Sequence, residues 1–308
     1  MFAYKRRVPT SGGELAVVDV GEGPPVVLVH GFPLSSYQWR HYVPLLSRRM
    51  RVIAPDLLGY GDSAKPESAP LGLEAQAGYV REMLAALEVD RFALVGAGLG
   101  TGIGQLLATG GAGVDAMILM SGTVGTRWPA ESIHEARRLD PALRTPDMAQ
   151  ALLRTGMDLG MGHRARLTED ELAEFVRPFA GDGGAAAFFR ALGAVDGLGL
   201  AGIEEGLSRL DIPVLILWGE EDTFNPVELA ELLNEQMPSS TLGLLPGCGH
   251  FVSEDAPDTI GPMAMEWLRA HYLKLPHGHP EPGGPVLVTL ERPRPDPGEY
   301  ELDDEEDE

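Results

Sequence analysis

Short apolar runs alternate with longer amphipathic segments in residues 1–121 and again after residue 210. Continuous runs of Val, Ile and Leu are typical of strands that are buried on both faces of a parallel sheet. We predict such strands at 25–30, 51–54, 92–95, 114–120, 213–218 and 240–245, and helices at about 36–47, 73–87, 99–108, 226–236 and 257–272. Two more strands, 3–8 and 14–20, are expected to form a hairpin. The alternation predicts an α/β fold with a mostly parallel, doubly wound sheet.

The pattern changes between these two parts. Residues 122–210 contain only helical patterns, among them a capping box at Thr168-x-x-Glu171. We interpret this block as a helical cap inserted into an α/β core formed by 1–121 and 211–272. Residues 273–308 are a Pro-rich, acidic tail that we expect to be disordered, although Val286 to Leu290 has the composition of a short edge strand.

The charge balance limits the partners. The sequence has 24 Lys and Arg against 46 Asp and Glu, a formal net charge of −22. Nucleic acids and anionic membranes are bound by clustered basic side chains, so we expect neither as a partner. The tail carries 11 acidic and 3 basic side chains, which makes it a candidate contact for a protein partner.

The cysteine content and the lack of targeting patterns bear on where in the cell the protein is located. The single cysteine, Cys248, excludes an internal disulfide and fits a reducing compartment. No apolar stretch follows the basic residues of Met1 to Arg7, as a secretory signal requires, and no run of about 18 apolar residues predicts a membrane span. We therefore expect a cytoplasmic protein.

Candidate chemistry begins at Gly96-Ala97-Gly98-Leu99-Gly100, which lies between a predicted strand and a predicted helix. Strand, sharp turn and helix form the context of the nucleophile elbow, Gly-x-Nuc-x-Gly. Gly98 occupies the nucleophile position and has no side chain. Glycine accepts the positive φ of this turn without the steric cost that other residues bear.

Two later motifs supply an acid and a base. Asp222 follows the strand 213–218, and His250 lies on a Gly-rich loop near the end of the core. The chain order 98, 222, 250 is that of nucleophile, acid and base in the fold that uses this elbow. Backbone N–H groups of Phe32 and Leu99 are the candidate oxyanion donors.

These and other motifs support a family resemblance. They are His30-Gly31-Phe32-Pro33, Tyr37-x-Trp39-Arg40, the segment from Ala54 to Ser63, and His250 followed by Glu254-Asp255-Ala256-Pro257. The chain resembles α/β-hydrolases of the haloalkane dehalogenase and epoxide hydrolase branch. The resemblance implies hydrolysis of small, mostly apolar compounds in a pocket between core and cap, with no cofactor and no metal. Trp128, at the cap entrance, and Trp39 are candidate binding residues.

The chain also departs from this branch. The nucleophile there is an aspartate followed by Trp, whereas this chain has Gly98 and Leu99. Dehalogenases commonly have Asn at the position of Phe32, and epoxide hydrolases use cap tyrosines, of which 122–210 has none. Three hypotheses follow: a degenerate member that binds a small ligand or a protein partner, an enzyme that uses the His250–Asp222 dyad without a covalent intermediate, or an enzyme with a nucleophile from the cap.

Other residues have plainer interpretations. Gly96-x-Gly98-x-Gly100-Thr101 lacks the third glycine of a dinucleotide fingerprint. Thr101 lies inside the predicted helix, where its hydroxyl is expected to bond to backbone rather than act as a nucleophile. Cys248 is interpreted as a structural thiol, and His277-x-His279 in the tail as a weak metal candidate.

Overall fold

The computed structural model describes residues 5–127, 130–162, 167–273 and 286–289. These residues form a nine-stranded sheet in the order β1-β2-β4-β3-β5-β6-β7-β8-β9. The strands are β1 (Arg6–Thr10), β2 (Gly13–Val20), β3 (Pro25–Val29), β4 (Arg51–Pro55), β5 (Phe92–Gly98), β6 (Val114–Gly122), β7 (Val214–Gly219), β8 (Ser240–Leu245) and β9 (Val286–Thr289). β2 pairs antiparallel with β1 and β4, and all other pairings are parallel. The predicted α/β fold is confirmed, as is an edge strand after residue 285.

The helices follow the predicted alternation. The α-helices are α1 (Val43–Leu46), α2 (Leu73–Ala86), α3 (Leu99–Thr109), α4 (Glu131–Arg137), α5 (Pro146–Gly160), α6 (Glu169–Val176), α7 (Gly181–Ala194), α8 (Glu204–Ser208), α9 (Val227–Gln236), α10 (Val252–Asp255) and α11 (Pro257–His271). Short 3₁₀ helices are η1 (Ser36–Trp39), η2 (Gly125–Arg127), η3 (Pro141–Leu143), η4 (Arg177–Phe179) and η5 (Leu198–Leu200). In the described part of the chain, no helix is long and apolar enough to cross a membrane.

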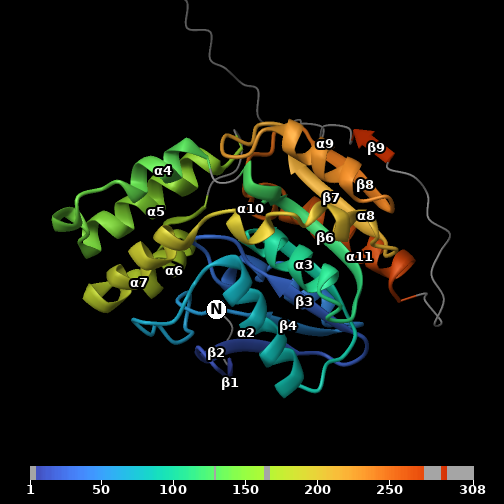
Figure 1. Ribbon diagram of the computed structural model, residues 1–308, viewed down its shortest axis with the longest axis horizontal. Helices are drawn as coiled ribbons and strands as arrows, with labels where there is room; N and C mark the ends of the chain where they lie inside the picture. The colour runs from blue at the N-terminus through green and yellow to red at the C-terminus, as the bar shows by residue number, and fades with distance from the viewer. Residues whose placement is uncertain (1–4, 128–129, 163–166, 274–285, 290–308) are drawn as a thin grey trace, which may run out of the picture.

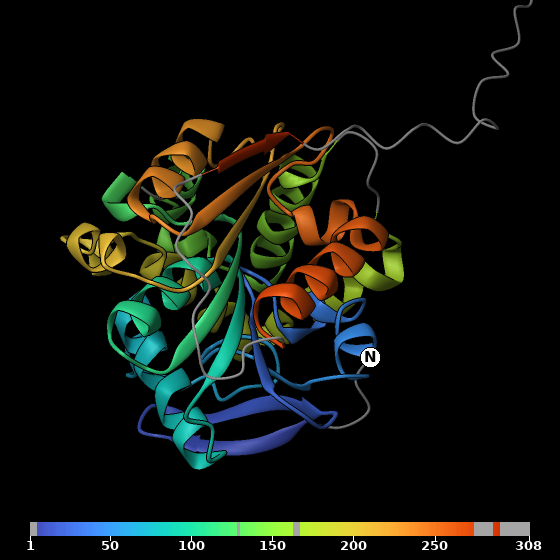
Figure 2. The same ribbon diagram turned by 90° about the vertical axis from the view of Figure 1, so that its right-hand side faces the viewer.

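Helices cover both faces of the sheet because alternate residues of each strand point to opposite sides. Val27 and Leu94 belong to one apolar cluster, with α2 and α3, and their neighbours Val26 and Val95 belong to a second, with α11. Figures 1 and 2 show these two helical layers with the twisted sheet between them. Apolar runs with no polar alternation were therefore a sound indication of doubly covered strands.

One predicted helix is divided in two. Residues 36–47 form η1 and α1, separated by a turn at Arg40–Tyr42, and Pro44 lies in the first turn of α1. Proline fits the first turn of a helix but cannot continue a helix that started earlier, because it has no N–H to donate. The element η1 packs against β3, and its Gln38 side chain accepts from the Gly31 N–H beside the candidate site.

Helices α4 to α8 lie between β6 and β7 in the chain, as predicted for 122–210. Helices α4 to α7, which we call the cap, pack against one another at the left of Figure 1, beyond the carboxyl ends of the central strands. The predicted capping box is present: the Thr168 hydroxyl accepts from the Glu171 N–H, and the Glu171 carboxylate accepts from the Thr168 N–H. The edge of the sheet that carries Gly98 therefore faces the cap.

Candidate active site

The strand–turn–helix at Gly98 has the conformation that the sequence predicts. Gly98 ends β5 with φ +51° and ψ −115°, and α3 begins at Leu99. The flanking glycines allow close packing, since a Cβ at Gly96 would collide with the Gly100 carbonyl, and one at Gly100 with the Val29 carbonyl. The fold therefore forms a sharp elbow at the carboxyl end of a central strand.

Asp222 and His250 meet beside this elbow. The Asp222 carboxylate accepts hydrogen bonds from the backbone N–H groups of Phe224 and Asn225, both at 2.9 Å. His250 Nδ1 lies 3.0 Å from Asp222 Oδ2 and 3.2 Å from Oδ1. The Asp222 side chain is fully buried and that of His250 is 11% exposed. A carboxylate held in this way accepts from Nδ1 and orients the ring.

The other ring nitrogen of His250 faces the elbow. A Cβ placed on Gly98 would lie 3.7 Å from His250 Nε2 and 3.3 Å from the Gly31 Cα. A hydroxyl or carboxyl on that Cβ would be within hydrogen-bond reach of the ring. The structure thus brings together all three positions that the chain order predicts.

A cavity of about 140 Å³ opens beside these residues. Its walls come from both the core and the cap, and Leu99 and Phe32 are part of them. The lining residues are Phe32, Pro33, Gly98, Leu99, Ala130, Ser132, Ile133, Ala136, Leu152, Thr155, Gly156, Leu159, Phe188, Leu192, Val195, Phe224, His250 and Phe251. Among the described residues around it, no Lys, Arg, Asp or Glu takes part. The cavity is apolar, and its polar side chains are His250, Ser132 and Thr155.

Of the two tryptophans that the sequence suggested as binding residues, the structure describes Trp39. Trp39 is fully buried and packs edge to face against Tyr42, with ring centroids 5.4 Å apart. It belongs to the apolar cluster on the α11 side of the sheet and does not line the cavity, so its assignment as a binding residue is wrong. Trp128 lies outside the described residues.

The His30 side chain stabilises the loop next to the elbow and does not line the cavity. Its ring accepts from the Leu57 N–H at Nε2, and Nδ1 lies 2.9 Å from the Gly31 carbonyl. Burial lowers the pKa of His30 to about 4. His30 is therefore neutral at pH 7 and fixes the backbone between β3 and Phe32.

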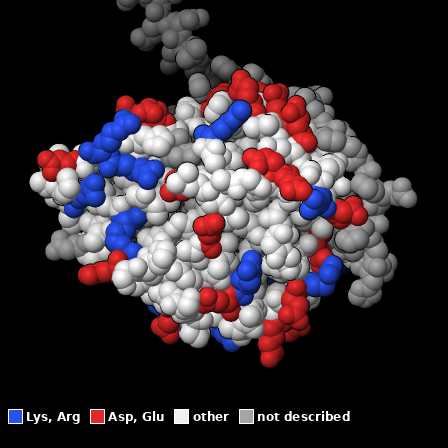
Figure 3. All heavy atoms as spheres, viewed as in Figure 1, with Lys and Arg blue, Asp and Glu red and all other residues white. Residues whose placement is uncertain are grey.

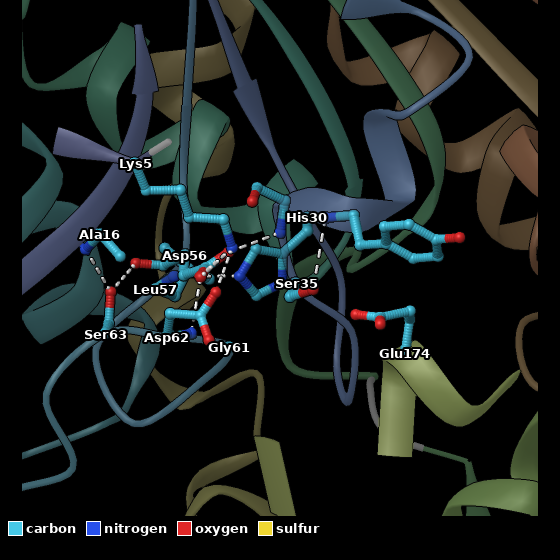
Figure 4. A network of polar contacts seen from close by, with 12 residues as sticks. Lys5, Ala16, His30, Ser35, Asp56, Leu57, Gly61, Asp62, Ser63 and Glu174 are labelled. Carbon is cyan, nitrogen blue, oxygen red and sulfur yellow. Dashed lines mark hydrogen bonds and ion pairs between the residues drawn. The ribbon is translucent and has the colours of Figure 1, made fainter. Parts of the chain in front are cut away.

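Asp56 and Asp62 organise the neighbouring loop, as Figure 4 shows. Asp56 accepts from the N–H groups of Ser36 and Asp62 and pairs with Lys5 at 2.6 Å. Asp62 pairs with Lys5 and with Arg177 of η4 at 2.9 Å, which links the core to the cap region. The network lies outside the cavity lining, and its role is structural.

The C-terminal end of cap helix α5 is hydrogen-bonded to the loops that carry Asp222 and His250. The Gly160 carbonyl accepts from the His250 N–H at 2.6 Å, and the Leu159 carbonyl from the Thr223 hydroxyl at 2.7 Å. Asp255 accepts from the N–H groups of Gly162 and Gly249, and burial raises the pKa of this carboxyl to about 6. Sequence reasoning missed this role of Asp255 because helical periodicity does not reveal which loop a helix end contacts.

The remaining candidates behave as their plainer interpretations predict, where they are described. Thr101 donates to the Gly98 carbonyl at 2.8 Å and lies 3.1 Å from the Thr123 hydroxyl, away from the cavity. Cys248 is buried, which raises the pKa of its thiol to about 12. Within the described ranges, no three His, Cys, Asp or Glu side chains are placed to hold a metal ion. His277 and His279 lie outside those ranges.

Comparison with known proteins identifies the family. The sequence model for the alpha/beta hydrolase fold family matches residues 24–257, more than half of the chain. The chain therefore belongs to the α/β hydrolase fold family, which the predicted fold class and the order of motifs had indicated.

Individual relatives show how broad this family is. The chain is 32% identical to a 2-hydroxy-6-oxo-2,4-heptadienoate hydrolase from Pseudomonas putida, over 80% of this chain and 90% of that protein. It is 29% identical to haloalkane dehalogenase 2 from Mycobacterium tuberculosis, over 83% and 92%. A crystal structure of an alpha/beta hydrolase fold protein from Burkholderia ambifaria superposes with a TM-score of 0.80 at 28% identity, over 86% and 98%. The expected likeness to a dehalogenase is confirmed, and the dienoate hydrolase is a further relative.

Proposed function

We propose that this hydrolase-family chain binds a small, mostly apolar molecule between core and cap and forms no covalent intermediate with it. One observation carries the proposal. The elbow, Asp222 and His250 are arranged as for nucleophilic catalysis, and the residue that faces His250 Nε2 is Gly98. Gly98 thus replaces the nucleophile of active relatives.

Covalent hydrolysis needs an oxygen or sulfur nucleophile that a neighbouring base activates. When a triad nucleophile is removed, binding and the oxyanion donors leave only residual catalysis. Neither Thr101 nor Cys248 lines the cavity, so neither replaces it. Ser132 and Thr155 of the cap do line it, but they lie on the exposed parts of α4 and α5.

The cavity favours a neutral ligand. Because its described walls carry no Lys or Arg, a bound carboxylate would lose its hydration without a permanent counter-charge. A dienoate, the compound class in the name of one relative, therefore fits this chain less well than an uncharged molecule such as a haloalkane or an aromatic compound.

A second candidate function is also supported by a specific observation. The His250–Asp222 pair is intact and faces an open cavity, so His250 has the geometry of a general base toward a water molecule or an acidic substrate. In this candidate, Phe32 and Leu99 N–H groups stabilise the oxyanion. A cavity filled by side chains would have excluded this second candidate function.

Turnover measurements separate the two candidates. Aryl esters, epoxides and haloalkanes are tested with the native chain and with Gly98→Ser and Gly98→Asp. Gly98→Ala is the matched control, since it adds the same Cβ at φ +51° but no nucleophile. We expect the native chain and Gly98→Ala to be silent, and a Ser or Asp variant to exceed them by at least about tenfold.

The contrary result is equally clear. If the native chain turns over a substrate and His250→Ala abolishes the activity, the dyad is a working base and the second candidate is correct. Activity that survives His250→Ala contradicts both candidates and points to a nucleophile elsewhere.

We further propose a cytoplasmic location, which the single cysteine supports, and the absence of a nucleic-acid partner, which the charge supports. The formal net charge is −22. On the face in Figure 3, acidic side chains are spread widely, and basic ones form one group over the cap at the left, with others scattered across the core. Such a field repels polyanions over most of that face.

A further inference from the structure

His250 lines the cavity, and its Nε2 faces the elbow at Gly98. Asp222 Oδ1 already accepts from two backbone N–H groups, at Phe224 and Asn225. An ionised carboxylate only accepts hydrogen bonds, so we assign Nδ1 of His250, 3.0 Å from Asp222 Oδ2, as the donor. In neutral imidazole the second nitrogen then has a lone pair and no proton. In the neutral ring with this tautomer, Nε2 accepts hydrogen bonds and donates none.

The protein itself offers this acceptor no donor among the residues that the structure describes. A serine at position 98 would place an O–H next to Nε2, because its Cβ would lie 3.7 Å away, whereas Gly98 has no side chain. The hydrogen bonds of the His250 ring are those of Nδ1 with Asp222. The His250 side chain is 11% exposed, so water pairs Nε2 until a ligand displaces it, and a displacing ligand without a donor leaves the acceptor unpaired. A ligand that brings an O–H therefore gains an interaction that an apolar ligand cannot make.

The rest of the cavity suits one aromatic ring. Phe32, Phe188, Phe224 and Phe251 contribute to its walls, and its volume is about 140 Å³. An engineered apolar cavity of about 150 Å³ in another protein binds benzene. Phe224 and Phe251 also meet the His250 ring edge to face, with centroids 5.2 and 5.1 Å apart. Of the three polar side chains of the cavity, His250 is the one that these two rings flank and that faces Gly98.

We propose that the pocket selects a small, uncharged phenol whose hydroxyl donates to His250 Nε2 in the place of the missing Gly98 side chain. This inference rests on the proposed function, because it names the ligand class of the same site. It sets the chain apart from its dehalogenase relatives, since haloalkanes have no O–H to donate. The ring packs among the four phenylalanines, and the hydroxyl takes the position of a nucleophile oxygen.

Three probes of one-ring size test the selection: phenol as donor, toluene as apolar match, and benzonitrile as acceptor only. Their dissociation constants are measured by calorimetric or NMR titration at pH 7 with the full chain. We expect phenol to bind at least as tightly as toluene. In His250→Leu the ratio of phenol to toluene affinity should fall about tenfold, because the hydroxyl is then buried without an acceptor.

Asp222→Asn is the sharper variant, because it reverses the polarity of Nε2 and keeps the shape of the site. The amide oxygen retains the Phe224 and Asn225 N–H groups, its NH₂ donates to Nδ1, and Nε2 then carries the proton. We expect phenol to lose affinity about fivefold and benzonitrile to gain by a similar factor. A purely structural effect would weaken all three probes together.

The outcomes separate this inference from the proposed function. If phenol and toluene bind with the same ratio in the native chain, His250→Leu and Asp222→Asn, the inference is overturned and apolar binding remains. If none of the probes binds the native chain, the proposed function fails and the inference fails with it. Thermal unfolding of each variant establishes that the comparison is made on folded protein.

Discussion

At the scale of single residues, three alternate glycines at the elbow have different reasons to be glycine. Gly96 and Gly100 are required by close backbone approach, and Gly98 has φ +51° and borders the cavity. The sequence predicted all three positions, because strand, turn and helix follow one another there. It assigned Trp39 wrongly, because a motif shows which residues are neighbours in the chain and not which side of the sheet they face.

Alanine substitutions at two of the glycines are expected to change stability in opposite directions. Gly100→Ala should destabilise the fold by roughly 1–3 kcal/mol or more, since the new Cβ would collide with Val29 backbone. Gly78→Ala, inside α2 with open space around the Cβ, should stabilise by about 0.5–1 kcal/mol, because alanine is the better helix former. Urea unfolding of both variants measures the difference. Equal effects would contradict the packing at the elbow.

At the scale of elements, one of the contacts that join the cap to the core is a cation between two acids. Arg40, which follows η1, pairs with Glu171 of α6 and with Glu254 of α10, at 2.9 and 2.8 Å. Sequence periodicity predicted that α6 exists and begins at Thr168. It did not predict this connection, since the partners lie far apart in the chain and each looks like an ordinary charge at a helix end.

This ion cluster predicts a pH effect with a definite sign. Burial raises the pKa of Glu254 to about 7 despite the Arg40 guanidinium. The native state then binds more protons than the unfolded chain between pH 4.5 and 7, so this carboxyl lowers stability as the pH rises through that window. The difference in free energy of unfolding between Glu254→Gln and the native chain should therefore shift in favour of the variant by on the order of 3 kcal/mol between pH 4.5 and pH 7.

A second variant provides the control for this prediction. The pKa of Glu171 falls to about 2, since hydrogen bonds from Thr168 and from Arg40 outweigh the effect of burial. Glu171 therefore makes its full contribution to stability above pH 4.5. The difference in free energy of unfolding between Glu171→Gln and the native chain should stay constant between pH 4.5 and 7. Chemical denaturation across this range measures both variants. Parallel curves for the two would contradict a raised Glu254 pKa.

At the scale of the whole molecule, hydrophobic patterning predicted which segments are strands and that the sheet is covered on both faces. It did not predict the order β1-β2-β4-β3-β5, because a run of Val and Leu does not record its neighbours in the sheet. The residues of the site could nevertheless be predicted. Parallel strands carry their functional loops at the same edge of the sheet, so residues 98, 222 and 250 meet although they are far apart in sequence.

Charge is also a property of the whole molecule, and it predicts the effect of two truncations. Residues 290–308 carry ten acidic and two basic side chains, a net charge of −8 of the total −22. Truncation after Thr289 should raise the melting temperature by a few degrees at 10 mM salt, because repulsion among like charges falls. In 0.5 M salt the change should nearly vanish, since screening removes it.

Truncation after Leu273 is the matched experiment, because residues 274–285 carry one Lys and one Glu and 286–289 carry no charge. Both truncations therefore remove the same net charge and differ in β9, which pairs with β8 from Thr241 to Leu244. The shorter chain should melt below the longer one at every salt concentration, since the edge of β8 loses its partner strand. If the two chains melt alike, β9 adds no stability. A loss of stability in 0.5 M salt on truncation after Thr289 would mean that residues 290–308 act through contacts rather than through charge.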